Sequence, residues 1–170
     1  MLFYDLTIPQ VLKMLRNMDR WLEAASAFAE KKKIDPAVLL KSRLAPDQFS
    51  FDKQIQLACD NAKSMAARLC GRDIPAHTDT EITVEQLRTR IQSVMAYLEA
   101  FKPEDFANAA EQRITLPWME EGKWMRAEDF IAQFALANFY FHVTTAYSIL
   151  RHNGVELGKR DFIGSLPVRS

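Results

Sequence analysis

Residues 127–154 read AEDFIAQFALANFYFHVTTAYSILRHNG, and this stretch decides the fold class. Its apolar residues recur at spacings of three and four, which predicts one long helix from about Ala127 to Asn153. Gly154 follows, and glycine commonly ends a helix because it adopts the left-handed conformation without strain. The predicted inner face carries Phe130, Ile131, Phe134, Asn138, Phe141, His142, Thr145 and Ile149.

Three further helices are predicted upstream from the same period. Thr7 can cap the first of them, and Pro9 is tolerated in its first turn. Gly71 is placed to end the second, and Thr83 with Gln86 forms a capping box at the start of the third. The predicted ranges are Thr7 to the lysine run at 31–33, Phe51 to Cys70, and Thr83 to Lys102.

The remaining segments connect these helices. Asp35-Pro36 restarts the chain into a short helical stretch that extends to Ser42. Residues 112–126 indicate a small hairpin or ordered loop before the last helix. Amphipathic helices of similar length bury their apolar faces most simply against one another. We therefore predict an all-α four-helix bundle in which residues 1–170 form a single domain.

The charge balance and the cysteines bear on partners and location. Lys plus Arg number 22 and Asp plus Glu number 22, so no net field gathers nucleic acid or anionic lipid. No segment approaches the roughly 18 apolar residues that span a bilayer, and the N-terminus lacks the pattern of an export signal. Two cysteines are too few for a disulfide framework. We expect a cytoplasmic protein that binds neither nucleic acid nor membranes.

Asn138 and His142 are the polar residues of the last helix that are the strongest candidates for a functional role. They lie four residues apart and project from the same side, which is the geometry of an intrahelical pair of metal ligands. An asparagine amide is, however, a poor ligand for zinc-like ions. The alternative is that the two side chains hydrogen-bond each other or a polar group on a facing helix, as buried polar atoms require.

The second predicted helix offers two candidates for a third participant. Cys59 faces inward, where it is either a small buried hydrophobe or, if a neighbouring cation lowers its pKa, a nucleophile. Asp60 falls on the polar side of the same helix. The sequence contains no phosphate-binding glycine loop, Gly-x-Ser-x-Gly elbow, His-Glu-x-x-His or Cys-x-x-Cys motif, so it names no reaction.

Five stretches spread over nearly the whole chain are NFYFHVTTAYSILRHNGV (138–155), LGKRDF (157–162), DP (35–36), RLAPD (43–47) and QIQLACDNAK (54–63). Together they resemble an uncharacterised bacterial family within the DinB/YfiT-like superfamily. The resemblance implies an up-down-down-up four-helix bundle, frequently dimeric. It also implies a metal held by one histidine of the second helix and a His-x-x-x-His pair of the fourth, and known members include metal-dependent thiol transferases.

Matched to that pattern, His142 takes the place of the second histidine of the pair and Asn138 the place of the first. The remaining ligand position falls near Asp60, and no histidine occurs in the second helix. The resemblance therefore implies that the three-histidine site is not present. A divalent metal such as zinc or nickel would need a modified set made of His142, Asn138 and Asp60.

Two functions from different classes fit these observations. The first is a small-ligand-binding or structural protein with a degenerate metal site, whose pocket near His142 includes Cys59, Phe134 and Thr145. The alternative is a metal-dependent enzyme, a transferase or hydrolase, with His142 as metal ligand or general base.

The resemblance also implies a homodimer. Trp118 and Trp124 either anchor such an interface or cover the core. The tail from Val155 to Ser170 contains several apolar residues, so we expect it to fold back across the bundle or across a partner subunit.

Overall fold

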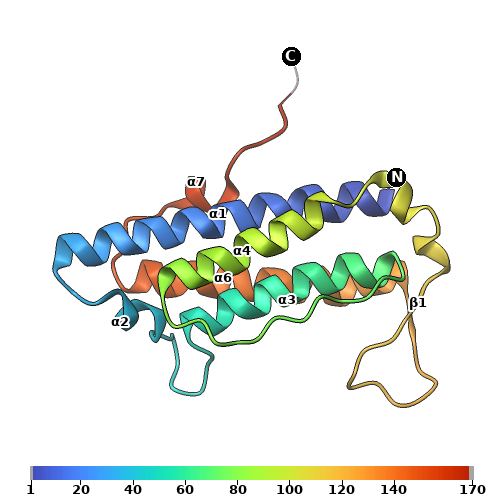
Figure 1. Ribbon diagram of the computed structural model, residues 1–170, viewed down its shortest axis with the longest axis horizontal. Coiled ribbons are helices and arrows are strands. Elements are labelled where there is room, and N and C mark those ends of the chain that lie inside the picture. Colours follow the sequence, from blue (N-terminus) through green and yellow to red (C-terminus); the bar gives the residue numbers. More distant parts are fainter. Residues whose placement is uncertain (1, 169–170) are drawn as a thin grey trace.

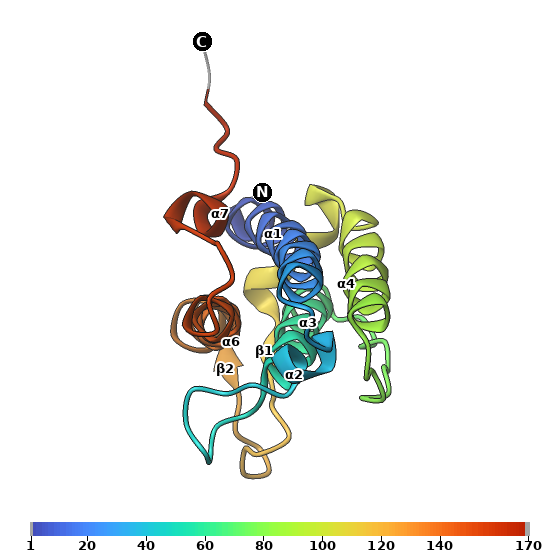
Figure 2. The same cartoon turned by 90° about the vertical axis from the view of Figure 1, so that its left-hand side faces the viewer.

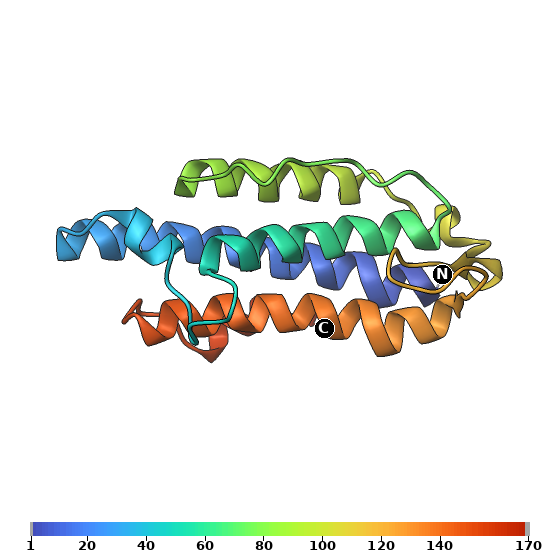
Figure 3. The same ribbon diagram turned by 90° about the horizontal axis from the view of Figure 1, so that it is seen from below.

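A computed structural model describes residues 2–168 and is mostly helical, with one small two-stranded sheet (Figure 1). Four long helical segments lie side by side (Figures 1 and 3). They are α1 (Leu2–Lys32), α3 (Phe51–Leu69), α4 (Val84–Glu99) and a last helix formed by α5 (Ala127–Asp129), the π-helical segment η3 (Phe130–Ala135) and α6 (Leu136–His152). Shorter helices are α2 (Pro36–Leu40), α7 (Lys159–Ile163) and the 3-10 segments η1 (Pro103–Phe106) and η2 (Ala109–Glu111).

The four long helices do not simply alternate in direction along the chain. α1 and α6 run in one direction, whereas α3 and α4 both run in the other (Figure 1). Residues 71–83, which we call the strap, make this possible by running back along α3 and α4 (Figure 3). The strap has no regular structure, and each of its residues is at least partly exposed. In the part of the chain that is described, no helix is long and apolar enough to cross a membrane.

The core lies between the four long helices. Seen end-on, α3 lies between α4 and α6, and α1 packs against the others (Figure 2). Burying one large apolar side chain contributes about 1.5–3 kcal/mol, so this shared interior is the main source of stability. The largest fully buried aromatic side chains are Trp21, Phe51, Phe106, Phe130 and Phe139.

The first helix begins earlier than the sequence predicts. α1 starts at Leu2, and Pro9 lies inside it. Thr7 is therefore not an N-cap, and its hydroxyl donates to the carbonyl oxygen of Phe3 at 2.6 Å instead. A threonine inside a helix can satisfy its hydroxyl on the preceding turn in this way, so the cap prediction was wrong.

The other helix ends follow the sequence signals. Asp35 caps α2 by accepting a hydrogen bond from the Ala37 backbone at 2.9 Å. Gly71 follows α3 with a φ of 61°, in the left-handed region. The capping box at the start of α4 is present. The backbone N–H of Gln86 donates to the Thr83 hydroxyl oxygen at 3.2 Å, and the backbone N–H of Thr83 donates to Oε1 of Gln86 at 3.2 Å.

The last helix contains a π-helical segment, η3 (Phe130–Ala135), which we call the π turn and which the periodicity does not reveal. A π turn holds one residue more than an α turn, so residues before it rotate by about 100° relative to an uninterrupted helix. Phe130 thereby joins the buried face together with Phe139, which is 0% exposed. Phe134 is partly buried and packs against the core, whereas Phe141 is 55% exposed, so placing Phe141 on the inner face was wrong.

The hairpin before the last helix is present and small. β1 (Arg113–Ile114) pairs antiparallel with β2 (Met125–Arg126). Trp118 and Trp124, in the connection, are 66% and 45% exposed, so neither is buried as a core residue.

The tail folds back on α1. The ring of Phe162 in α7 stacks on Trp21 with centroids 5.8 Å apart, and the indole N–H donates to the Asp161 carbonyl at 3.2 Å. Gly164 then turns the chain with a φ of 68°, and a Cβ there would meet the Asn17 amide at 2.6 Å. This backbone can pass Asn17 only because residue 164 is glycine. The prediction for Ser170 lies outside the described residues.

Candidate functional site

The seam between α3 and α6 contains the conspicuous histidine. His142 is 7% exposed, and its Nδ1 lies 2.7 Å from Oε1 of Gln54 on α3. The Gln54 amide donates its own Nε2–H to the carbonyl oxygen of Phe49 at 3.0 Å, which orients Oε1 toward the imidazole. Because Oε1 only accepts, Nδ1 of His142 carries the proton and donates it.

The other nitrogen of His142 is therefore an acceptor. Its Nε2 has no hydrogen-bond partner among residues 2–168, yet it is not one of the polar atoms closed to solvent. Burial lowers the pKa of this imidazole below its ordinary value, so the ring is neutral near pH 7. The seam thus presents one oriented nitrogen lone pair, which suits a ligand donor or a metal ion.

The partner of Asn138 is an amide rather than His142. Its Nδ2 donates to Oδ1 of Asn61 at 2.6 Å, and Asn61 in turn donates to the Leu57 carbonyl at 2.8 Å. The predicted hydrogen bonding to a facing helix is therefore found for both Asn138 and His142. The facing groups on α3 are neutral amides, which bind zinc-like ions poorly.

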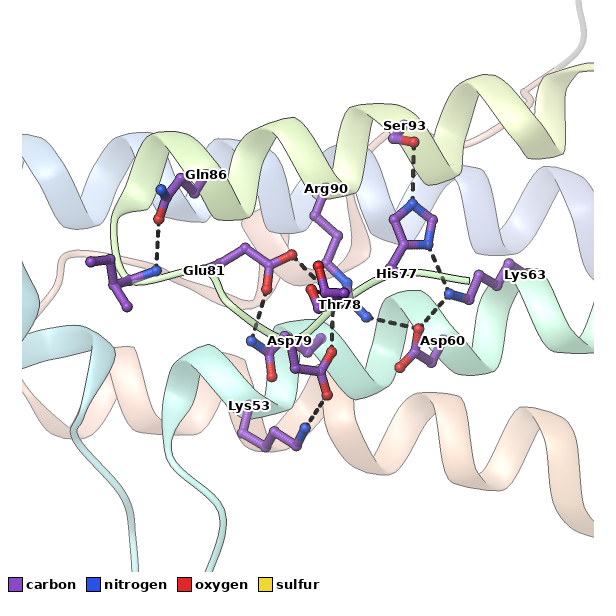
Figure 4. A network of polar contacts seen from close by, with 12 residues as sticks. Lys53, Asp60, Lys63, His77, Thr78, Asp79, Glu81, Gln86, Arg90 and Ser93 are labelled. Atoms are coloured by element: carbon purple, nitrogen blue, oxygen red, sulfur yellow. Dashed lines mark hydrogen bonds and ion pairs between the residues drawn. The ribbon is translucent and has the colours of Figure 1, made fainter. Parts of the chain in front are cut away.

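Asp60 does not join this seam. Its carboxylate faces α4 and pairs with Arg90 of that helix at 2.8 Å (Figure 4). It also pairs with Lys63 of its own helix at 2.7 Å. The assignment of Asp60 as a third ligand beside His142 was wrong, because the residue lies on the α4 side of α3. No group of three or more His, Cys, Asp or Glu side chains between residues 2 and 168 is arranged to hold a metal ion.

A charged network joins α3, α4 and the strap. Arg90, whose side chain is 1% exposed, pairs with Asp60, with Asp79 at 2.9 Å and with Glu81 at 3.0 Å (Figure 4). Glu81 also accepts from Gln56 on α3 at 2.9 Å. The buried guanidinium therefore holds the strap on the body of the protein through charge-assisted hydrogen bonds.

Ser93, His77 and Lys63 form a row that resembles a catalytic arrangement. Lys63 lies 2.8 Å from Nδ1 of His77, and Nε2 of His77 lies 3.3 Å from the Ser93 hydroxyl oxygen. An ammonium group only donates, so Nδ1 accepts and the ring proton sits on Nε2. The imidazole faces Ser93 with a proton instead of a lone pair, which makes it unable to activate that hydroxyl as a base.

The stability of this network is expected to depend on pH through His77. Burial lowers the pKa of His77, and the nearby cations of Lys63 and Arg90 lower it further against the opposing carboxylates of Asp60 and Glu81. A base with a lowered pKa favours the folded state when neutral, so stability is lost as pH falls below the ordinary value of about 6.5. Urea unfolding at pH 7.5 and 5.5 should show a smaller loss in His77→Gln than in the wild type. An equal loss in both proteins would contradict this contribution.

One of the three predicted pocket residues, Cys59, is closed off in the core. Cys59 is 0% exposed in the core, and burial raises the pKa of its thiol to about 12, so it is a buried hydrophobe and not a nucleophile. Thr145 is 7% exposed, so little of its surface is open to a ligand. Assigning Cys59 to a pocket was therefore wrong, and the assignment of Thr145 stays a prediction.

Phe134 does line a cavity, farther along the same seam. The cavity measures about 230 Å³ and lies between α3, the hairpin connection and the π turn. Its wall includes Asn61, Ser64, Arg68, Trp118 and Phe134. Asn61 also holds Asn138, so the polar part of the seam and the cavity are continuous.

Sequence reasoning missed Gln54, Asn61 and Arg68, the residues of α3 that make this seam. They recur every seven residues, which places them on one face of a helix two turns apart. That spacing was the available signal. It was hidden because the apolar stripe of the same helix passes directly beside these positions.

Comparisons with known proteins identify the family of the chain. The family described as a domain of unknown function, DUF1993, matches residues 3–163. A solved structure described as a DinB family member protein from Shewanella denitrificans is 50% identical, with 99% of this chain and 96% of that chain covered and a TM-score of 0.95. No curated protein matches the sequence significantly. The chain belongs to the DUF1993 family, an uncharacterised, DinB-like family of domains of unknown function.

Proposed function

We propose that this protein binds a small ligand without catalysing a reaction, on a four-helix bundle of the DinB/YfiT type whose metal site is degenerate. The observation that carries the proposal is the pairing along the α3–α6 seam. His142 is held by Gln54 and Asn138 by Asn61, at 2.7 and 2.6 Å. Both ligand positions on α6 are thus engaged by neutral amides, and the third, Asp60, is paired with Arg90 and Lys63.

Neutral amide partners favour a hydrogen-bonded seam over a metal centre. A divalent ion in a protein interior is normally held by charged carboxylates or thiolates and by imidazoles. His142 is the sole residue of these types in the seam pairs described above. The adjoining cavity of about 230 Å³ supports a binding function, because it combines apolar walls with a few polar groups.

The alternative is a metal-dependent transferase or hydrolase that uses His142. One observation favours it: the Nδ1–H of His142 is fixed by Gln54, which leaves an oriented lone pair on Nε2. Metal-binding histidines are commonly oriented through their second nitrogen in this way. An enzyme of this kind would have to recruit its remaining ligands from water or substrate.

Elemental analysis of protein purified without an affinity tag separates the two functions. We expect zinc and nickel well below one ion per chain, both in the wild type and in His142→Ala. His152→Ala is the matched control, because it removes an exposed imidazole at the end of α6. A full equivalent of metal that persists in His152→Ala and disappears in His142→Ala would sink the proposed function and favour the enzyme.

A further inference from the structure

We propose that the cavity between α3, the hairpin connection and the π turn binds a small aromatic carboxylate, with its ring against Trp118 and Phe134 and its carboxylate on the guanidinium of Arg68. This inference rests on the proposed function and names its ligand class. The cavity joins residues of three separate segments, so the folded chain builds it and no single helix does.

The size of the cavity sets the size of the ligand. Its volume of about 230 Å³ falls below the range of about 300–1,000 Å³ that is typical of pockets for drug-sized molecules. A cavity of about 150 Å³ is already large enough to admit benzene. One six-membered ring with a single small substituent therefore fits, and a fused or extended ligand does not.

Arg68 supplies the charge. Its Nε is closed to solvent and has no hydrogen-bond partner, and within residues 2–168 the guanidinium makes no ion pair. One Nη group donates to the carbonyl oxygen of Thr115, which fixes the head group at the cavity wall. A half-buried cation without an ion pair is costly, and the second Nη group, which has no partner among the described residues and is not closed to solvent, is the donor that a carboxylate in the cavity would meet.

No acid between residues 2 and 168 forms an ion pair with Arg68. Burial alone lowers the pKa of its guanidinium, with no contribution from a neighbouring acid. By contrast, Arg72, one turn further along, pairs with Asp105. Arg68 is thus a guanidinium at the cavity wall whose counter-ion is left for a ligand to provide.

Aromatic side chains supply the ring site. Trp118 and Phe134 lie with ring centroids 5.8 Å apart, and Phe130 stacks on Phe134 at 6.0 Å. The π turn is what places Phe134 at the cavity edge, and π turns occur frequently at functional sites. Trp118 also lines the cavity and is 66% exposed, so a bound ring would gain a second aromatic face.

Benzoate and its neutral analogue benzamide test the proposal directly. The indole N–H signal of Trp118, assigned with Trp118→Phe, is followed by NMR during titration of each compound into the full chain. We expect benzoate to bind the wild type about tenfold or more tightly than benzamide, as a hydrogen bond to a charged group predicts. Arg68→Gln should abolish this preference while leaving benzamide binding unchanged, which also shows that the variant is folded. Arg43→Gln, which changes an exposed arginine outside the cavity, should keep the preference.

The possible failures are distinguishable. Equal binding of benzoate and benzamide, or a benzoate preference that survives in Arg68→Gln, overturns the ligand class and leaves the proposed function in place. If neither compound moves the Trp118 signal at millimolar concentration, no single ring enters this cavity. That result overturns both the ligand class and the proposal that the cavity is the binding site.

Discussion

Arg90→Met is expected to lower the free energy of unfolding by about 3–5 kcal/mol, the usual cost of removing one member of a buried ion pair. The guanidinium is 1% exposed and lies within 3.0 Å of carboxylate oxygens of Asp60, Asp79 and Glu81. Methionine fills much of the volume but leaves these acids to repel one another, with lysines as their remaining partners. Urea denaturation at pH 7 measures the loss.

A matched substitution separates this effect from loss of charge in general. Arg16→Met removes an arginine that pairs with Glu99 at 2.6 Å, but the two side chains are 50% and 52% exposed. An exposed pair of this kind contributes less than about 1 kcal/mol. If Arg90→Met costs no more than Arg16→Met, the network does not hold the strap as we describe.

Phe139→Ala is expected to cost about 3–5 kcal/mol, whereas Phe141→Ala should cost less than about 1 kcal/mol. The two residues lie on the same helix, but Phe139 is 0% exposed and Phe141 is 55% exposed. Deleting the first ring leaves a cavity in the core, while deleting the second removes surface already in water. Chemical denaturation of both variants gives the comparison.

This pair of variants also tests the π turn. An uninterrupted helix that keeps Phe130 on the inner face would place Phe134 and Phe141 there as well. A larger loss for Phe141→Ala than for Phe139→Ala would show that the last helix follows that regular period. The variants share one amino-acid change and one helix, so helix propensity affects both equally.

Most of the helical framework was predictable because its signals are local. The capping box at Thr83, Gly71 and the Asp35-Pro36 start each depend on residues within one turn of the helix end. The start of α1 was mispredicted because threonine satisfies its hydroxyl equally well inside a helix. The π turn could not be predicted from spacing, because the apolar residues keep the regular helical spacing through residues 130–135.

Only the α6 side of the candidate site was predictable from the sequence, and the α3 side was not. Asn138 and His142 stand out as polar residues in an apolar stripe, and the structure confirms that both meet polar groups on a facing helix. Which groups they meet depends on how far α3 and α6 slide along each other, and a single sequence does not contain that offset. Gln54 and Asn61 were therefore missed, and Asp60 was placed in the wrong seam.

Holding the strap by charge has a consequence for local motion. None of its residues is buried, so its detachment exposes little apolar surface and does not require the core to open. Amide protons in residues 71–83 should consequently exchange with solvent through partial opening, ahead of those in α3. Because a strap of this kind connects two helices that run the same way, a protease that cuts it would leave two fragments still associated through their shared interior.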